Sequence, residues 1–194
     1  MNYPLQFSFK IMALAPQIFV TDAHGQLIFY VKQKLLKLKE SVTVFANAEQ
    51  TTPLYTIQAD RVIDFAARYY FTDAEGNTIG AVQRQGMRSL WKARYEVLNG
   101  EQVVMTIREK NPWVKVLDRL LGQIPIVNIF SGYFLHPAYQ VSRAESTEVM
   151  LLEKRPAFLE ARFTVHRHVE LDPQEETQIL LSLLMMSLLE RKRG

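Results

Sequence analysis

"TQILLSLLMMSLLERKRG", Thr177 to Gly194, closes the chain and is its most apolar segment with a helical pattern. From Ile179 to Leu189 it holds only leucine, isoleucine, methionine and two serines. Asp172 and Pro173 precede it, and they provide an N-cap acceptor and a proline at the first helical position. The basic cluster that follows suits the negative end of a helix dipole. The pattern therefore predicts an α-helix over residues 173–191.

Apolar side chains cover every face of this predicted helix. At about 100° per residue, Ile179 and Leu183 lie on one side, and Leu181 and Leu184 lie nearly opposite. The apolar run is shorter than the ~20 residues that a membrane-spanning helix needs. A helix that is apolar all round is normally buried all round. We therefore favour a core helix over an exposed helix that binds a partner or a membrane.

An internal repeat describes the rest of the chain. "FVTDAHGQLIFYV" begins at Phe19 and "YFTDAEGNTIGAV" begins at Tyr70, an offset of 51 residues. Each copy reads as a strand, an Asp-Ala-x-Gly turn and a second strand. Aspartate can accept hydrogen bonds from the turn backbone, and glycine accepts a positive φ. The repeated aspartate and glycine are therefore predicted to form the turn.

Further hairpins extend the repeat. Residues 42–57 and 93–107 each predict a second hairpin, the latter around Asn99-Gly100. A third, more diverged unit predicts strands at 138–142, 148–154, 158–163 and 165–171. Roughly twelve strands form a sheet that tends to curl, and closure removes its edges. We predict an all-β, single-domain protein over residues 1–194: an antiparallel closed barrel around a hydrophobic C-terminal helix, with an apolar insertion at 111–137.

Several of these segments carry a resemblance. "VKQKLLKLKESVTVF", the duplicated TDA-x-G turns and "KARYEVLNGEQVVMTI" resemble the LURP-one-related family, over about Lys10 to Leu189. That family belongs to the tubby C-terminal-like superfamily, which includes the phospholipid scramblases. The resemblance implies a barrel of about twelve strands around a hydrophobic C-terminal helix. It also implies a link to lipids, because tubby proteins bind phosphoinositide head groups through basic residues and scramblases act at membranes.

A lysine-rich run is the candidate lipid or phosphate site: Lys32, Lys34, Lys37 and Lys39. Strand parity changes between the two pairs, so a bulge or tight turn at 35–36 would bring all four to one side. Each lysine near an anionic surface contributes ~1 kcal/mol. Charged residues also protect sheet edges from aggregation, which is the competing interpretation.

The insertion at 111–137 is the second candidate contact surface. Its apolar residues include Trp113, Leu117, Leu120, Leu121, Phe130 and Phe134. We favour a helix that caps one mouth of the barrel. The alternative is a membrane-interfacial or dimerisation element, because tryptophan and other aromatics beside lysine and arginine suit an interface.

Composition and motifs argue against catalysis. The chain has no cysteine, which excludes disulfides and thiolate chemistry, and it contains no hydrolase, zinc-protease or nucleotide-binding motif. His166 and His168 share a strand face with Glu170, but no further ligand at diagnostic spacing completes a metal site. Asp22 and Asp73 are explained by turn formation. We expect no enzymatic activity, no catalytic residue, no cofactor and no metal.

The expected function is a lipid- or phosphoinositide-responsive binding module, cytoplasmic and peripheral on the inner membrane surface. The net charge of +3 permits anionic phospholipid head groups as partners. Nucleic acid is not expected, because neither an RNP-like aromatic motif nor a basic helix is present. No signal peptide is evident at the N-terminus. The competing hypothesis is a soluble scaffold that forms a homo-oligomer or binds a protein partner through residues 111–137.

Overall fold

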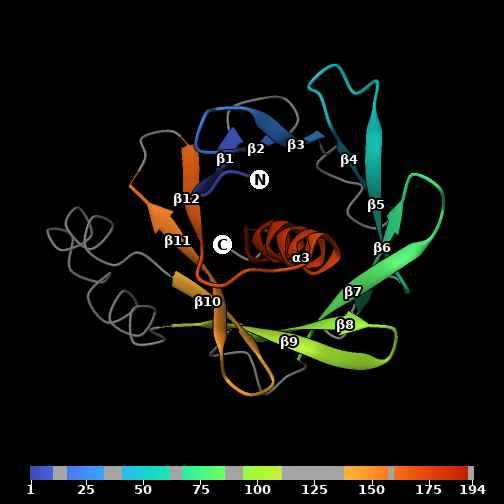
Figure 1. The fold of residues 1–194 in the computed structure, drawn as a ribbon. Coiled ribbons are helices and arrows are strands. Elements are labelled where there is room, and N and C mark those ends of the chain that lie inside the picture. The colour runs from blue at the N-terminus through green and yellow to red at the C-terminus, as the bar shows by residue number, and fades with distance from the viewer. Residues whose placement is uncertain are drawn as a thin grey trace, which may run out of the picture.

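The computed structural model describes residues 1–10, 17–32, 41–61, 67–85, 94–110, 138–156 and 160–191. These residues form twelve strands arranged in a ring around a helix (Figure 1). The elements are β1 (Leu5–Lys10), β2 (Gln17–Thr21), β3 (Leu27–Lys32), β4 (Val42–Phe45), β5 (Pro53–Ala59), β6 (Arg68–Asp73), β7 (Thr78–Arg84), β8 (Arg94–Asn99), β9 (Gln102–Glu109), β10 (Ala138–Arg143), β11 (Glu148–Arg155), β12 (Glu160–Arg167) and α3 (Pro173–Arg191).

The sheet is a closed antiparallel barrel, as the sequence predicts. Each strand pairs with the next one along the chain, and β1 pairs with both β2 and β12. Leu5 lies opposite Val165 and Phe7 opposite Phe163 where the ring closes. Closure pairs every described strand on both sides, so none of them is left as a free edge.

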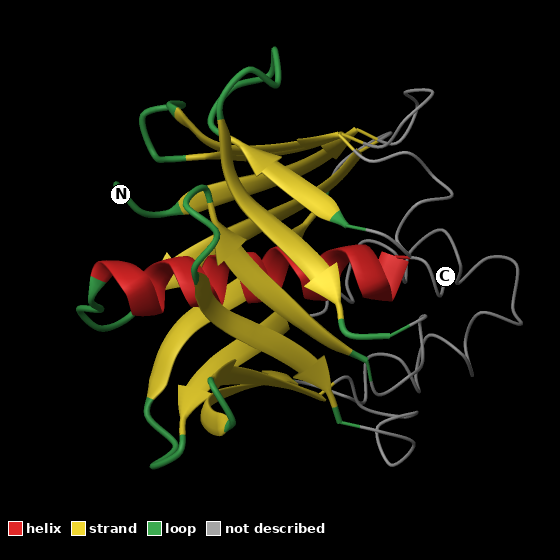
Figure 2. Ribbon diagram, turned by 90° about the vertical axis from the view of Figure 1, so that its right-hand side faces the viewer, coloured by secondary structure: helices red, strands yellow, loops and turns green. Residues whose placement is uncertain are grey.

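Helix α3 runs through the barrel along its axis (Figure 2). Its apolar side chains from Ile179 to Met186 are at most 1% exposed. Inward-facing side chains of the strands, such as Phe7, Val20 and Ile107, belong to the same core. The prediction of a core helix is confirmed. Within the described ranges, no helix has both the length and the apolar character needed to cross a membrane.

The N-cap and the two core serines of this buried helix form hydrogen bonds within the helix itself. Asp172 caps the helix, because its Oδ1 accepts hydrogen bonds of 2.9 Å from the backbone N–H groups of Gln174 and Glu175. The hydroxyls of Ser182 and Ser187 donate to helix carbonyls one turn earlier, each at 2.7 Å. The two serines therefore sit in the core without unpaired hydroxyls.

The repeated Asp-Ala-x-Gly turns have the predicted geometry. Gly25 donates its backbone N–H to the carbonyl of Asp22 at 2.9 Å, and Gly76 does the same to Asp73 at 3.2 Å. Both glycines have positive φ, 78° and 91°. A register shift precedes each turn, and the β10–β11 hairpin has a shift at the corresponding place. The third unit is therefore a structural repeat as well.

One part of the strand prediction is wrong. In place of the two strands expected at 158–163 and 165–171, the described residues form one strand, β12, over Glu160–Arg167. Thr164, between them, stays in the ladder opposite Gln6, and its hydroxyl bonds to the Gln6 carbonyl oxygen Oε1 at 3.1 Å. The twelfth strand is instead the N-terminal β1, which completes the third unit by pairing with β12.

Candidate functional site

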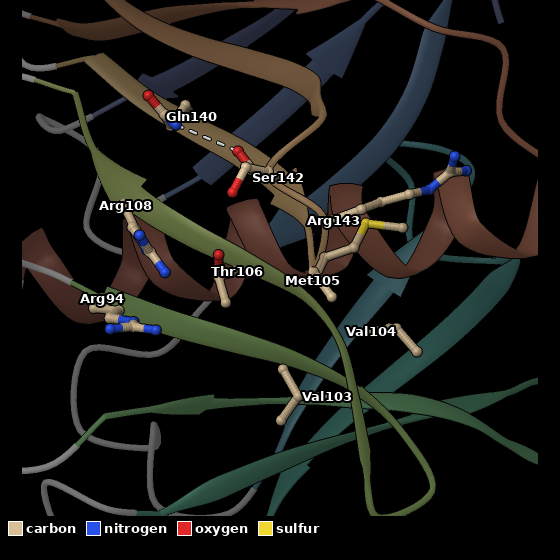
Figure 3. A pocket seen from close by; sticks show the side chains of 11 residues that line it. Arg94, Val103, Val104, Met105, Thr106, Arg108, Gln140, Ser142 and Arg143 are labelled. Carbon is tan, nitrogen blue, oxygen red and sulfur yellow. Dashed lines mark hydrogen bonds between the residues drawn. The ribbon is translucent and has the colours of Figure 1, made fainter.

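A groove lies on the outer wall of the barrel, across β8, β9 and β10 (Figure 3). Its volume is about 300 Å³. Arg94, Thr106 and Arg108 alternate along β8 and β9 with the core residues Tyr95 and Ile107, which places their side chains on the outer face of the wall. The lining residues are Arg94, Val103, Val104, Met105, Thr106, Arg108, Gln140, Ser142, Arg143, Ala144 and Ser146.

Two arginines meet at one end of this groove. Arg94 on β8 lies directly opposite Arg108 on β9, and Figure 3 shows their side chains next to each other. Like charges directly opposite each other destabilise a sheet. No carboxylate of the described residues lies within ion-pair distance of either arginine. The Arg94 Nε is buried and lacks a hydrogen-bond partner in the described part of the chain. This end of the groove is therefore suited to an anion.

In a second cross-strand arginine pair of the same barrel, both guanidinium charges are neutralised by neighbouring carboxylates. Arg155 on β11 lies opposite Arg162 on β12. Arg155 Nη2 is 3.3 Å from a carboxylate oxygen of Glu153, and Arg162 Nε is 3.1 Å from one of Glu160. Each guanidinium of this pair has its own carboxylate, whereas Arg94 and Arg108 have none among the described residues.

Hydroxyl and amide groups continue the groove beside the arginine pair. Gln140 on β10 lies opposite Arg108, and Ser142 lies opposite Thr106. The Gln140 amide donates a hydrogen bond of 3.3 Å to the Ser142 hydroxyl (Figure 3). These groups can donate to oxygens of a bound anion that the guanidinium groups do not reach. Val103, which is 38% exposed, supplies an apolar margin.

Of the predicted lysine cluster, Lys32 falls within the described residues. It ends β3 and is exposed. Gln17 lies between Lys32 and Lys10 in the ladder of β1, β2 and β3, and the Lys10 Nζ lies 4.8 Å from the ring centroid of Phe19. This basic face is on a different part of the ring from the groove (Figure 1).

The other predicted site residues lie outside the described residues, and their assignment stays a prediction: Lys34, Lys37 and Lys39 of the lysine cluster, and Trp113, Leu117, Leu120, Leu121, Phe130 and Phe134 of the insertion.

The two histidines of the β12 region have separate partners. The Nε2 of His166 is 3.6 Å from a carboxylate oxygen of Glu153, and the Nδ1 of His168 is 3.2 Å from one of Glu148. Glu170 pairs instead with Arg167 at 3.4 Å. In the portion of the chain that was described, no three potential metal-ligating side chains gather.

Both turn aspartates accept hydrogen bonds from the backbone of their own hairpins, and Asp22 Oδ2 also accepts one of 3.1 Å from the Asn2 amide. Asp73 Oδ2 accepts from the Asn77 amide at 3.0 Å, and Oδ1 accepts from the backbone N–H groups of Glu75 and Asn77. These bonds, that of the Asn77 side chain first, lower the pKa of the Asp73 carboxyl. Asp22 accepts equivalent bonds in its own turn. Both carboxylates act in turn formation.

Sequence reasoning missed Arg94 and Arg108, although a signal existed. Folding the chain about the Asn99-Gly100 turn brings residues near 94 and 108 together. A register shift between Val97 and Leu98 then sets which residues face each other. A bulge of this kind leaves no distinctive sequence pattern, so the pairing had to come from the structure.

Fold and site together define a class: an antiparallel barrel whose lumen is filled by its own C-terminal helix and whose polar groove lies on the outer wall. A family model described as LURP-one-related matches residues 27–186, and the chain belongs to this family. The fold is consistent with the link to the tubby C-terminal-like superfamily. No curated protein matches the chain. No solved structure matches it either.

Proposed function

We propose that this chain is a non-enzymatic module that binds phosphate-bearing anionic head groups at a membrane surface. The observation that carries the proposal is the cross-strand pair of Arg94 and Arg108, which faces an open groove without a carboxylate from the described residues. Arginine forks bind phosphate oxygens in pairs, and such charge-assisted hydrogen bonds are stronger than neutral ones.

The shape of the molecule supports a head group as the ligand. Helix α3 fills the lumen, so binding at this site takes place on the outer wall. A groove of about 300 Å³ is at the small end of ligand sites, which suits a phosphorylated head group. Lys32 adds positive charge on another face, and it begins the predicted lysine cluster.

Co-sedimentation with vesicles tests the proposal. We expect binding to rise with the fraction of phosphate-bearing anionic lipid and to fall with salt, because exposed charges are screened. Replacing Arg94 and Arg108 together by glutamine should weaken binding by roughly 30-fold, from about 1 kcal/mol for each arginine near the surface. Undiminished binding by this double variant would contradict the proposed site.

The matched control is the double replacement of Arg155 and Arg162 by glutamine. It makes the same change in net charge at a cross-strand arginine pair, but each of these arginines already has a carboxylate partner. We expect little loss of binding. An equal loss in the two double variants would mean that overall charge, and not the groove, drives attachment.

Two further experiments test the lysine cluster and a free anion as ligand. In the first, Lys32, Lys34, Lys37 and Lys39 are replaced by glutamine. If the lysine cluster makes a second contact with the membrane, this replacement should weaken vesicle binding. Titration with inorganic phosphate, followed by NMR, tests a free anion as the ligand. Equal affinity for free phosphate and for vesicles would favour a soluble ligand. If the chain binds neither free phosphate nor vesicles, and Trp113→Ala changes the oligomer size, the scaffold hypothesis would be favoured.

The absence of enzymatic activity is part of this proposal. The groove offers guanidinium, amide and hydroxyl groups, which bind and orient an anion, and the described residues that line it include no carboxylate or imidazole to act as a general base. A screen with phosphoesters and acyl esters should show no turnover. Turnover that is lost in the Arg94 and Arg108 double variant would contradict this part.

A further inference from the structure

The third repeat unit departs from the first two at its turn. In the first two turns an aspartate carboxylate accepts hydrogen bonds from the backbone of its own hairpin. The corresponding residue of the third turn is Arg143, whose guanidinium can only donate. Among the described residues, the hydrogen bonds of the Arg143 side chain go to Glu175 and not to its own turn.

The backbone of this third turn is nevertheless conserved in form. Ser146 donates its N–H to the carbonyl of Arg143 at 3.0 Å, and Arg143 donates to Thr147 at 3.0 Å. Ser146 has φ of 71°, a left-handed conformation that the other two turns give to glycine. Both Arg143 and Ser146 line the groove. The repeat has kept its turn and changed the side chains that face the candidate site.

The guanidinium of Arg143 is directed at the core helix. Its Nη2 lies 2.9 and 3.1 Å from the two carboxylate oxygens of Glu175, in the first turn of α3. Figure 3 shows the side chain extending away from Arg94 and Arg108, although all three line one groove. The Arg143 and Glu175 side chains are 34% and 29% exposed, so water reaches the pair.

We propose that Glu175 holds the Arg143 guanidinium away from Arg94 and Arg108, so that Arg143 is a third anion-binding arginine whose availability depends on the first turn of α3. This inference rests on the proposed function of the groove. An anion held by Arg94 and Arg108 competes with the Glu175 carboxylate for the same guanidinium. Because an exposed ion pair is weak, a multivalent anion can win this competition.

Coupling between two sites is reciprocal. If freeing Arg143 strengthens anion binding, then a bound anion must weaken the attachment of the first turn of α3 to the wall. Anion binding in the groove would thereby change how firmly the first turn of α3 is attached to the barrel wall. Two independent measurements follow, one on affinity and one on the helix.

The affinity measurement uses Glu175→Gln, which removes the charge that retains Arg143. Binding to vesicles with phosphate-bearing anionic lipid should tighten by roughly two- to fivefold, the range that a pair of this exposure can account for. The matched control is Glu176→Gln on the same turn. Its partner is Arg167, at 3.1 Å, which does not line the groove, so affinity should not change.

A double-mutant cycle separates this mechanism from a general effect of charge. In an Arg143→Gln background, Glu175→Gln should no longer alter affinity. The same tightening in both backgrounds would overturn the inference, because it would show that Glu175 acts by long-range repulsion alone.

The helix measurement is hydrogen exchange of the amides of residues 175–178. Exchange should become faster when vesicles are bound, and this change should be absent in Arg143→Gln. Protection that stays constant on binding would contradict the coupling.

The outcomes for the two proposals are distinct. If Arg94 and Arg108 are needed for binding but Glu175→Gln has no effect, the groove stands and the coupling is wrong. If neither the wild-type chain nor Glu175→Gln binds, both are wrong. Binding that is detected only in Glu175→Gln would support the coupling directly.

Discussion

The hydroxyl of Tyr95, on β8, donates a hydrogen bond of 2.7 Å to a carboxylate oxygen of Glu190, in the last turn of α3. The same oxygen lies 3.9 Å from Nη2 of Arg84 on β7. Burial raises the pKa of the Tyr95 hydroxyl well above its usual range, and the negative charge of Glu190 raises it further. The tyrosine therefore remains a donor at all ordinary pH values, and it connects the end of the helix to the barrel wall.

Removing this donor should destabilise the barrel. Tyr95→Phe keeps the buried ring and deletes the hydroxyl, so the free energy of unfolding should fall by about 1–2 kcal/mol, as expected for a hydrogen bond to a charged group. Urea denaturation followed by circular dichroism measures the change. Tyr55→Phe is the control, because no hydrogen bond joins the Tyr55 hydroxyl to the described residues. Equal losses in the two variants would argue against a role for the Glu190 contact.

Gly80 allows the helix and the wall to approach each other. A Cβ at this position would lie 3.0 Å from the Gln178 Nε2 and 3.0 Å from the Leu98 carbonyl oxygen. The Gln178 amide also donates a hydrogen bond to the Ile79 carbonyl. Gly80→Ala should therefore lower the melting temperature and cost about 1–3 kcal/mol, since overpacking forces the helix away from β7.

Gly76→Ala provides the comparison for Gly80→Ala. Gly80 has a φ of 156° and Gly76 one of 91°, so both are positive. A Cβ at Gly76, however, would meet nothing within 4 Å. Gly76→Ala should lower stability less than Gly80→Ala does. It strains the backbone of the turn but disrupts no contact, whereas Gly80→Ala also disrupts the packing of the helix on the wall. If Gly76→Ala were the more destabilising variant, steric contact with Gln178 and Leu98 would not be the reason for glycine at position 80.

The interior face of α3 should not tolerate charge. Leu184 is fully buried in the middle of the helix. Leu184→Asp should abolish soluble folding, because an isolated buried carboxylate costs several kcal/mol even after its pKa has risen. The yield of soluble protein and its circular dichroism are the measurements. Gln174→Asp, at an exposed position of the first turn, should fold normally. A native-like Leu184→Asp protein would contradict the buried helix.

Asp172 should make stability depend on pH. The backbone N–H of Glu175, followed by that of Gln174, holds the pKa of its carboxyl below the ordinary value of 3.8. A group with a lowered folded-state pKa stabilises the fold above the unfolded-state value, and this contribution is lost as pH falls through the folded-state pKa. The advantage of the wild-type chain over Asp172→Asn should therefore shrink below pH 3.8.

Unfolding in urea at several acidic pH values measures this difference. Asparagine caps a helix about as well as aspartate but does not titrate in this range, so Asp172→Asn isolates the charge. Asp172→Ala removes the cap itself and should be less stable at every pH. A constant difference between the wild-type chain and Asp172→Asn would show that the charge makes no contribution.

Local patterns predicted most of the strands. The Asp-Ala-x-Gly turns and the Asn99-Gly100 turn each require particular backbone angles, so those hairpins could be placed from residue types alone. The division of residues 158–171 into two strands was wrong because Thr164, a polar residue, faces outward from a continuous strand. The strand β1 was not anticipated because one of its two partners, β12, lies almost at the other end of the chain.

The candidate site depended on tertiary structure to a greater extent. The sequence indicated the lysine cluster as a site, because its four charged residues lie close together in the chain and can be recognised without a structure. Arg94 and Arg108 are separated by a hairpin, and Arg143 reaches the same groove from β10. That Arg143 corresponds to the two turn aspartates became evident only when the three hairpins showed the same backbone hydrogen bonds.

The residue pattern alone was enough to predict a closed barrel around its own C-terminal helix. A repeated hairpin unit and a helix that is apolar on every face leave few other ways to bury the apolar surface. The positions at which charged side chains meet on the outer wall could be seen only in the folded chain. Strand register and bulges set that arrangement, and both are settled by packing across the whole barrel, since a shift of one residue turns every outward side chain inward.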